Sequence, residues 1–261
     1  MISLRGVFLI AKSVLIEAVR RREIYVIVLA ASLLIGMVMS IDFFDIKGLT
    51  KFYRETALKV MGMATAATVI VLAARQLPRE FERRTIYPLM ARPISRLTFI
   101  AGKLLGVMFS AVFCFALFML IFVFGTWRLG GEIPWGLFLQ HIYLQLLMLL
   151  ILATLSFWLS MLMNFDAALT VGALFYFSAA FASTVILYLY DSSGTLFRWF
   201  LLAVNYGIPQ LTLFDLSGKA VHAQAWEPLS FSVMAQLTAY GLSFAVIYFA
   251  FATICFRRRP L

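Results

Sequence analysis

The chain alternates long apolar segments with short polar ones. Six of the apolar segments contain few or no charged residues and come close to or exceed the length of about 20 residues that a helix needs to cross a membrane. They predict transmembrane helices at residues 24–41, 57–75, 103–124, 137–163, 167–190 and 229–256. We therefore expect an all-α polytopic membrane protein in which residues 1–261 form a single transmembrane domain.

Residues 4–22 show a different pattern, with apolar and polar positions on opposite faces of a helix. The apolar face comprises Leu4, Val7, Phe8, Ala11, Val14, Leu15, Ala18 and Val19. Arg5 and Glu17 lie largely opposite, which predicts an interfacial helix along the membrane surface. A simple extension of the first span is the alternative, because Ile10 and Ile16 blur the apolar face.

Residues 191–228 contain two short apolar pieces, interrupted by Asn205, Gly207 and Pro209. Neither piece is long enough to cross a membrane. Such pieces are typical of interfacial or re-entrant helices, whose backbone polar groups must be satisfied by protein or water at that depth. We expect them to form short helices on the outer side, before the last span.

Charge, proline and glycine gather between the second and third spans, in residues 75–106. Seven of the 22 basic residues lie there. Because proline lacks an N–H and clashes with the preceding turn, Pro78, Pro88 and Pro93 are expected to cut the stretch into short pieces. The piece at about 79–87 would be a short amphipathic helix. Its apolar side would be Phe81 and Ile86, and its polar side Glu80, Glu82, Arg83 and Arg84.

Composition excludes a soluble domain, because 63% of the residues are hydrophobic and only 13% are charged, whereas about a quarter are charged in soluble proteins. The net charge of +10 is not interpreted as nucleic-acid binding, since the basic residues cluster beside the spans. Placing the N-terminal segment, the loop between spans two and three and the C-terminus in the cytoplasm puts 15 basic residues inside and 7 outside. The positive-inside rule therefore predicts a multi-pass protein of the cytoplasmic (inner) cell membrane with both termini in the cytoplasm.

The order T-I-Y-P-L-M-A-R-P-I-S-R, followed six residues later by G-K-L-L-G, resembles the cytoplasmic loop of ABC-2 type export permeases. The likeness is nearest to the branch often associated with copper-enzyme maturation. One departure is Arg84, where the family commonly has glycine. The positions that match the family pattern are Glu82, Thr85, Leu89, Pro93, Ile94, Ser95, Arg96, Gly102, Lys103 and Gly106.

The resemblance implies an elbow helix at residues 4–22, a cytoplasmic coupling helix within the loop at 75–102, and outer helices at 191–228 that cap the transport route. It also implies an ATPase subunit, in two copies per complex, that contacts the loop. The residues expected to make this contact are Glu80, Glu82, Arg83, Arg84, Thr85, Arg92, Pro93, Ser95 and Arg96. A competing interpretation is that the arginines only anchor the loop to anionic lipid.

Catalytic motifs are absent from the sequence. It contains no H-E-x-x-H, no G-x-S-x-G and no G-x-x-x-x-G-K-[ST], so we expect neither hydrolytic chemistry nor ATP binding by a P-loop of its own. His141 is interpreted as a polar residue at the rim of the fourth span. Cys114 and Cys255 are interpreted as packing residues, because neither is placed for a disulfide framework and two thiols make no metal site.

These observations favour a permease subunit that exports an unidentified substrate, binds no cofactor directly and uses ATP hydrolysed on the partner subunit. It would pair with a second copy or a homologous permease within membrane lipid. Small residues of the fifth span, among them Gly172 and Ala173, are the candidate dimer interface, with packing inside the chain as the alternative. Asn205 and Gln210 would lie near the exit of the path. The alternative function is a non-transporting scaffold or mechanical transmitter coupled to the same kind of ATPase.

Overall fold

The computed structural model describes residues 4–20, 22–40, 49–82, 95–192, 194–221 and 226–258. All its regular elements in these residues are helical, which confirms the predicted all-α class. They are α1 (Leu4–Val19), α2 (Arg22–Ser40), α3 (Leu49–Glu82), α5 (Arg96–Arg128), α6 (Trp135–Leu162), α7 (Phe165–Ser192), α8 (Thr195–Gly207), the 3₁₀ helix η2 (Leu211–Phe214), α9 (Ser217–Val221) and α10 (Phe231–Arg258).

Four of these helices are long and apolar enough to cross a membrane, namely α3, α5, α6 and α10. Two shorter apolar segments lie at Tyr25–Val38 in α2 and at Phe165–Ala179 in α7. Within the described residues, length and composition therefore support four spans directly. The prediction of six spans goes beyond this finding.

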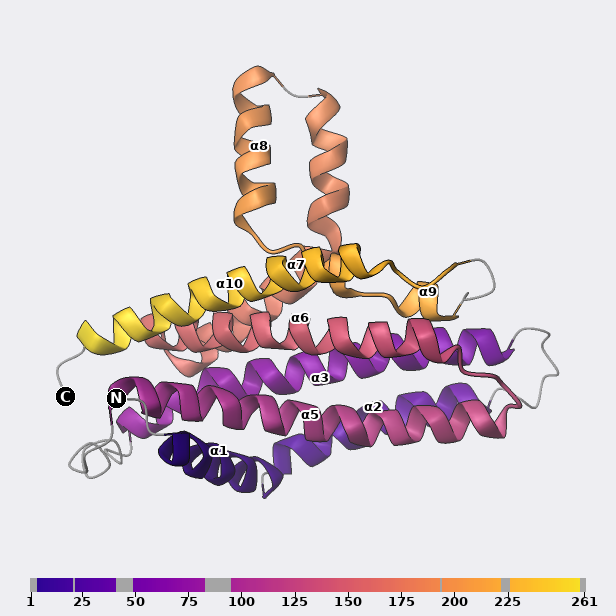
Figure 1. The fold of residues 1–261 in the computed structure, drawn as a ribbon, viewed down its shortest axis with the longest axis horizontal. Coiled ribbons are helices and arrows are strands. Elements are labelled where there is room, and N and C mark those ends of the chain that lie inside the picture. Colours follow the sequence, from indigo (N-terminus) through magenta and orange to yellow (C-terminus); the bar gives the residue numbers. More distant parts are fainter. Residues whose placement is uncertain are drawn as a thin grey trace.

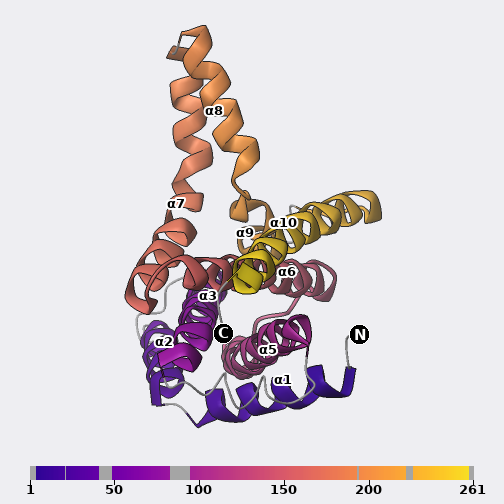
Figure 2. The same cartoon turned by 90° about the vertical axis from the view of Figure 1, so that its left-hand side faces the viewer.

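The long helices run side by side and form an elongated bundle, with α6 between α3 and α10 (Figure 1). The helix α1 does not join this alignment; it lies crosswise against α5 at one end of the bundle (Figures 1 and 2). The C-terminal end of α3, the N-terminal end of α5 and the C-terminal end of α10 lie at that same end (Figure 1). The elements that flank the charged loop are therefore neighbours in space.

Two hydrophobic clusters fill the bundle. The larger one joins α3, α5 and α6 with parts of α1 and α10. The smaller one lies toward the opposite end, where Phe122 stacks on Tyr53 and Phe138 with ring centroids 6.4 and 5.2 Å apart. Aromatic stacking of this kind adds to the stabilisation from burial, so both ends of the bundle are firmly packed.

The helix α7 starts within the bundle and then leaves it, and α8 returns alongside its distal part (Figures 1 and 2). Arg198 of α8 donates a hydrogen bond from Nε to the carbonyl oxygen of Tyr190 at 2.9 Å, which links the two helices. The exposed side chains of this hairpin include Tyr188, Leu196 and Trp199. The short helices expected before the last span are therefore present as α8, η2 and α9, while their depth in a membrane stays a prediction.

One expectation about the charged loop is wrong. Pro78 does not cut the chain; α3 continues through it to Glu82. Two physical reasons account for the difference. The missing N–H of Pro78 costs α3 a single hydrogen bond, the one to the carbonyl four residues earlier, and contacts of the neighbouring residues Gln76 and Glu80 with Lys103 hold the end of the helix in place. The distal part of the amphipathic helix expected at 79–87 lies outside the described residues.

Candidate functional site

The connection between α3 and α5 is the region in which the sequence places most of its candidate residues. Glu80, Glu82, Ser95 and Arg96 belong to the described residues and flank this connection. The other candidates lie outside the described residues, and their roles stay predictions; they are Arg83, Arg84, Thr85, Arg92 and Pro93. The geometry of the site is therefore that of its two stems, the end of α3 and the start of α5.

A buried ion pair joins the two stems. Lys103 of α5 donates from Nζ to Oε1 of Glu80 at 2.6 Å and to Oε1 of Gln76 at 3.2 Å. Lys103 is only 5% exposed, and the Glu80 side chain 18%. A buried charge without its partner is strongly destabilising, so this pair fixes the spacing and rotation of α3 against α5. Lys103 belongs to the family motif, but its pairing with Glu80 was not predicted from the sequence. The available signal was a lysine at the start of an apolar span, since such residues usually need an acidic partner.

The same end of α3 is joined to α1. Arg79 donates from Nη1 to Oε1 of Glu17 at 2.7 Å. Both side chains are partly exposed to solvent, so this pair contributes little to stability by itself. Its role is positional, because it connects the crosswise helix α1 to the stem of the loop.

Two glycines let α1 approach α5 closely. A Cβ atom at Gly102 would lie 2.8 Å from Cβ of Ile10, and one at Gly106 would lie 2.5 Å from Cβ of Val14. Both distances are shorter than real carbon contacts. Glycines four residues apart form a shallow notch on one face of a helix, which is how helices come into direct backbone contact in lipid. The motif G-K-L-L-G therefore has two structural roles: its glycines receive α1 and its lysine binds α3.

The C-terminal end of α10 completes the cluster. Arg96 donates from Nη1 to the carbonyl oxygen of Arg257 at 2.9 Å, a favourable position for a cation at the C-terminus of a helix. Phe256 packs against Phe81 and Phe99 with ring centroids 6.2 and 5.9 Å apart. The expectation that Phe81 rests on an apolar surface is therefore confirmed.

Ser95 has a defined structural role at the start of α5. Its backbone is extended, with φ −68° and ψ 146°, and its Oγ accepts a hydrogen bond from the backbone N–H of Thr98 at 3.1 Å. This is the geometry of a helix N-cap. Ser95 therefore fixes the residue at which the loop becomes helix, and a contact with an ATPase at this position stays a prediction.

The candidate dimer residues lie on α7. Gly172 is buried inside the chain, where an added Cβ would lie 2.9 Å from Cγ2 of Ile70 and 3.4 Å from Oγ of Ser156. This is the intramolecular packing that the sequence left open as the alternative. Ala173 is half-buried. A dimer contact at these two positions stays a prediction.

His141 lies near the start of α6, at the end of the span where the sequence placed it, but its burial was not predicted. Its side chain lies in the interior of the bundle and is 1% exposed. A polar residue near the end of an apolar segment carries no local sign of the helices that will cover it. Here α3 and the segment around η2 lie against this part of α6, so tertiary packing decides the outcome.

The chain is similar to a known family over nearly its whole length. No curated protein matches the chain significantly. A family model described as "ABC-2 family transporter protein" matches residues 8–261. Members of this family lack an ATPase domain, and ATP is used by a separate ATPase. The match covers nearly the whole sequence and leaves the branch within the family open. The chain therefore belongs to the ABC-2 family and is the membrane component of a transporter of that family.

Proposed function

We propose that the chain is a six-span half-permease of an ABC exporter, with α2 and α7 as spans beside the four long helices. The helix α2 comprises 19 residues, close to the length of about 20 that crosses the hydrocarbon layer, and α7 contributes the apolar segment Phe165–Ala179 before it leaves the bundle. Six spans place both termini on one side of the membrane. Basic residues are in excess in the N-terminal segment, the loop between α3 and α5 and the C-terminus. By the positive-inside rule, this favours a cytoplasmic location for these segments and an inner cell membrane for the protein.

The observation that supports a coupling role is that both stems of the charged loop are bonded to neighbouring helices. The end of α3 is joined to α5 through Lys103 and to α1 through Arg79, and the start of α5 is joined to α10 through Arg96. A force applied to the loop by an ATPase would therefore move four helices together. In this proposal α1 is the elbow helix and the segment after Glu82 is the coupling element.

The partner ATPase would bind the charged residues of the loop. Glu82 is exposed at the end of α3, and Arg84, Arg92 and Arg96 would offer bidentate contacts to carboxylates. Two permease halves would each bind one ATPase subunit, and alternation between conformations of the dimer would open a path for the substrate. Asn205 and Gln210 would lie near the exit of that path.

Co-purification tests this proposal. Glu82→Arg and Arg84→Glu should abolish capture of an ABC ATPase from native membranes, identified by mass spectrometry, while yield and dimer content stay unchanged. Arg128→Glu reverses an exposed charge at the far end of α5 and serves as the matched control, which should retain the ATPase. If the loop variants capture and stimulate the ATPase normally and only their membrane yield falls, the arginines act as lipid anchors and the coupling role is wrong.

A second experiment tests the pairing of two halves through α7. Ala173→Cys, in a chain whose two native cysteines are replaced, should form a disulfide-linked dimer under mild oxidation. A cysteine at Leu120, an exposed position on α5, should not form one. Equal crosslinking at both positions would indicate random collision, and none at Ala173 would remove α7 from the interface.

A further inference from the structure

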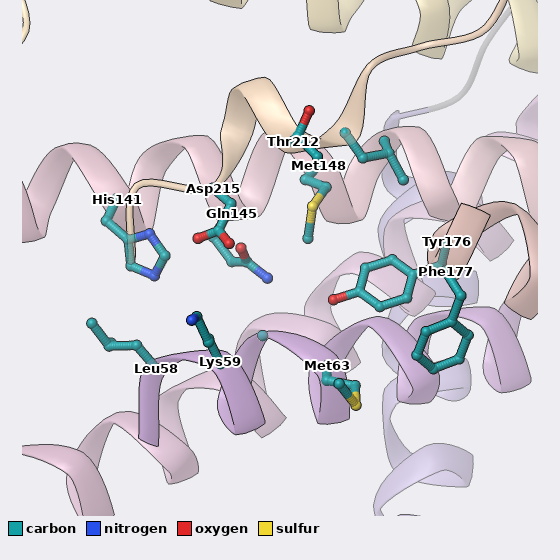
Figure 3. A pocket seen from close by; sticks show the side chains of 12 residues that line it. Leu58, Lys59, Met63, His141, Gln145, Met148, Tyr176, Phe177, Thr212 and Asp215 are labelled. Atoms are coloured by element: carbon teal, nitrogen blue, oxygen red, sulfur yellow. The ribbon is translucent and has the colours of Figure 1, made fainter. Parts of the chain in front are cut away.

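A cavity of about 260 Å³ lies between α3, α6, α7 and the segment around η2. Its lining residues take no part in the contacts of Arg79, Arg96 and Lys103 described above. Figure 3 shows that its lining side chains are not evenly distributed: His141, Gln145 and Asp215 gather toward one end, and Tyr176 and Phe177 lie at the other. The cavity is therefore polar at one end and aromatic at the other.

The floor of the polar end consists of two buried side chains on α6. His141 and Gln145 are one turn apart and are 1% and 2% exposed. Both ring nitrogens of His141 and the Nε2 of Gln145 lack a hydrogen-bond partner within the described part of the chain. Buried polar groups are almost always hydrogen-bonded in native proteins, and exceptions require an explanation such as a bound molecule. The two side chains therefore point to an occupant of the cavity.

Asp215 gives the polar end its charge. Its Oδ1 accepts a hydrogen bond from the backbone N–H of Ser217 at 2.9 Å, and no cation pairs with its carboxylate among the residues that the structure describes. The carboxylate shares the lining of the cavity with His141 and Tyr176. Lys59 also lines the cavity, and its Nζ lies 2.6 Å from Oε1 of Glu55. Asp215 is exposed, so the polar end of the cavity has a solvent-accessible negative charge, with the ammonium group of Lys59 also in the lining.

The other end suits an apolar body. Tyr176 and Phe177 present aromatic rings there, and the thioethers of Met63 and Met148 lie between them and the polar end (Figure 3). Aromatic faces attract organic cations, and methionine adapts its flexible side chain to different shapes. This half of the cavity would accept a hydrocarbon or aromatic group beside a positive charge.

We propose that this cavity is a binding site for an organic cation with an apolar body. The cationic group would lie between Asp215 and the unprotonated ring nitrogen of His141, both of which can accept its N–H groups. The body would lie against Met63 and Phe177. If the chain exports a substrate as proposed above, this site would give the transporter its substrate class; the binding itself does not depend on an ATPase.

Three small ligands of similar size test the charge preference. The full-length chain in phosphatidylcholine nanodiscs, without any ATPase, is unfolded by heat in the presence of hexylammonium, hexanol or hexanoate. A ligand that binds the folded state raises the Tm, and the rise grows with the logarithm of the ligand concentration once this exceeds the Kd. We expect such a rise in Tm with hexylammonium only.

Variants of the lining residues test whether the preference for a cationic ligand arises in this cavity. Asp215→Asn removes the charge but keeps an oxygen that can accept from Ser217, and it should weaken the apparent affinity for hexylammonium about tenfold or more. His141→Leu should also weaken it. Asp166→Asn, which removes an exposed carboxylate in the first turn of α7 outside the cavity, should leave the affinity unchanged.

Several outcomes would overturn the proposal. Equal Tm rises with hexanol and hexylammonium would show that charge is not recognised. A hexylammonium effect that persists in Asp215→Asn and His141→Leu would place binding elsewhere, and no rise with any ligand would indicate a cavity filled by water. If Asp215→Asn does not fold, the ligand ranking in the wild type and in His141→Leu decides. Co-purification of the ATPase does not involve the cavity, so either proposal can fail without the other.

Discussion

Gly106 of α5 faces Val14 of α1 with no room for a side chain between them. An added Cβ would lie 2.5 Å from the Cβ of Val14 and 2.9 Å from the carbonyl oxygen of Ala11. The backbone of α1 is thus in direct contact with α5. Since the second contact is with backbone, a larger residue could be accommodated only if the helices moved apart.

The first prediction concerns this contact. Gly106→Ala should lower the free energy of unfolding by about 1–3 kcal/mol, the usual result of overpacking. Gly36→Ala is the control, because an added Cβ there meets nothing within 4 Å, and it should raise stability by about 0.5–1 kcal/mol. Thermal unfolding of both variants in nanodiscs measures the difference. A neutral Gly106→Ala would show that α1 is not held by the notch.

The second prediction concerns the ion pair of Lys103 with Glu80. Glu80→Gln leaves a buried ammonium group without its counter-charge and should cost about 3–5 kcal/mol of stability. Adding Lys103→Met to this variant should recover most of the loss, which a double-mutant cycle measures. The exposed pair of Glu55 and Lys59 is the control, where each single change should cost about 0.5 kcal/mol or less. Additive losses at Lys103 and Glu80 would show that the pair is not a unit.

The third prediction concerns the proline inside α3. Pro78→Ala should raise the Tm, because alanine restores a backbone N–H and removes the clash of the ring with the preceding turn. Pro78→Gly should give a less stable protein than Pro78→Ala by about 1 kcal/mol, the difference in helix propensity. A lower Tm for Pro78→Ala than for the wild type would mean that the ring itself makes a stabilising contact.

The fourth prediction concerns topology. Cysteines introduced at Lys47 and Ser193 should react with a membrane-impermeant maleimide added to intact cells, and one at Arg83 should react only after permeabilisation. The positive-inside distribution of the basic residues is the reason for this expectation. Labelling of position 83 from the outside of intact cells would contradict the proposed orientation.

Local patterns were sufficient for most of the helices. Apolar runs and turn residues predicted six long helices, and the helices begin and end within a few residues of those limits because hydrophobic length is a local property. The exceptions are α5, which begins at Arg96, seven residues before the predicted limit, and α3, which begins before and ends after its apolar part. Its polar ends are held by tertiary contacts, such as that of Glu80 with Lys103, and no local pattern contains these.

The sequence predicted the region of the candidate site but not the contacts that its residues make. The motif residues Gly102, Lys103 and Gly106 were identified by resemblance, and their contacts join segments that are far apart in sequence. The burial of His141 was missed for the same reason. A single sequence records which residues are apolar, whereas the choice of partner depends on how whole helices pack.

The crosswise placement of α1 has a consequence for biogenesis. This helix is synthesised before α2 and α3, yet the notch that receives it lies on α5, which is made later. Its outward residues Leu4 and Leu9 are apolar and exposed, so the newly made helix can rest in the headgroup layer until α5 is inserted. Docking of α1 is therefore a late event of membrane insertion, and protease resistance of the N-terminal segment would report when it has taken place.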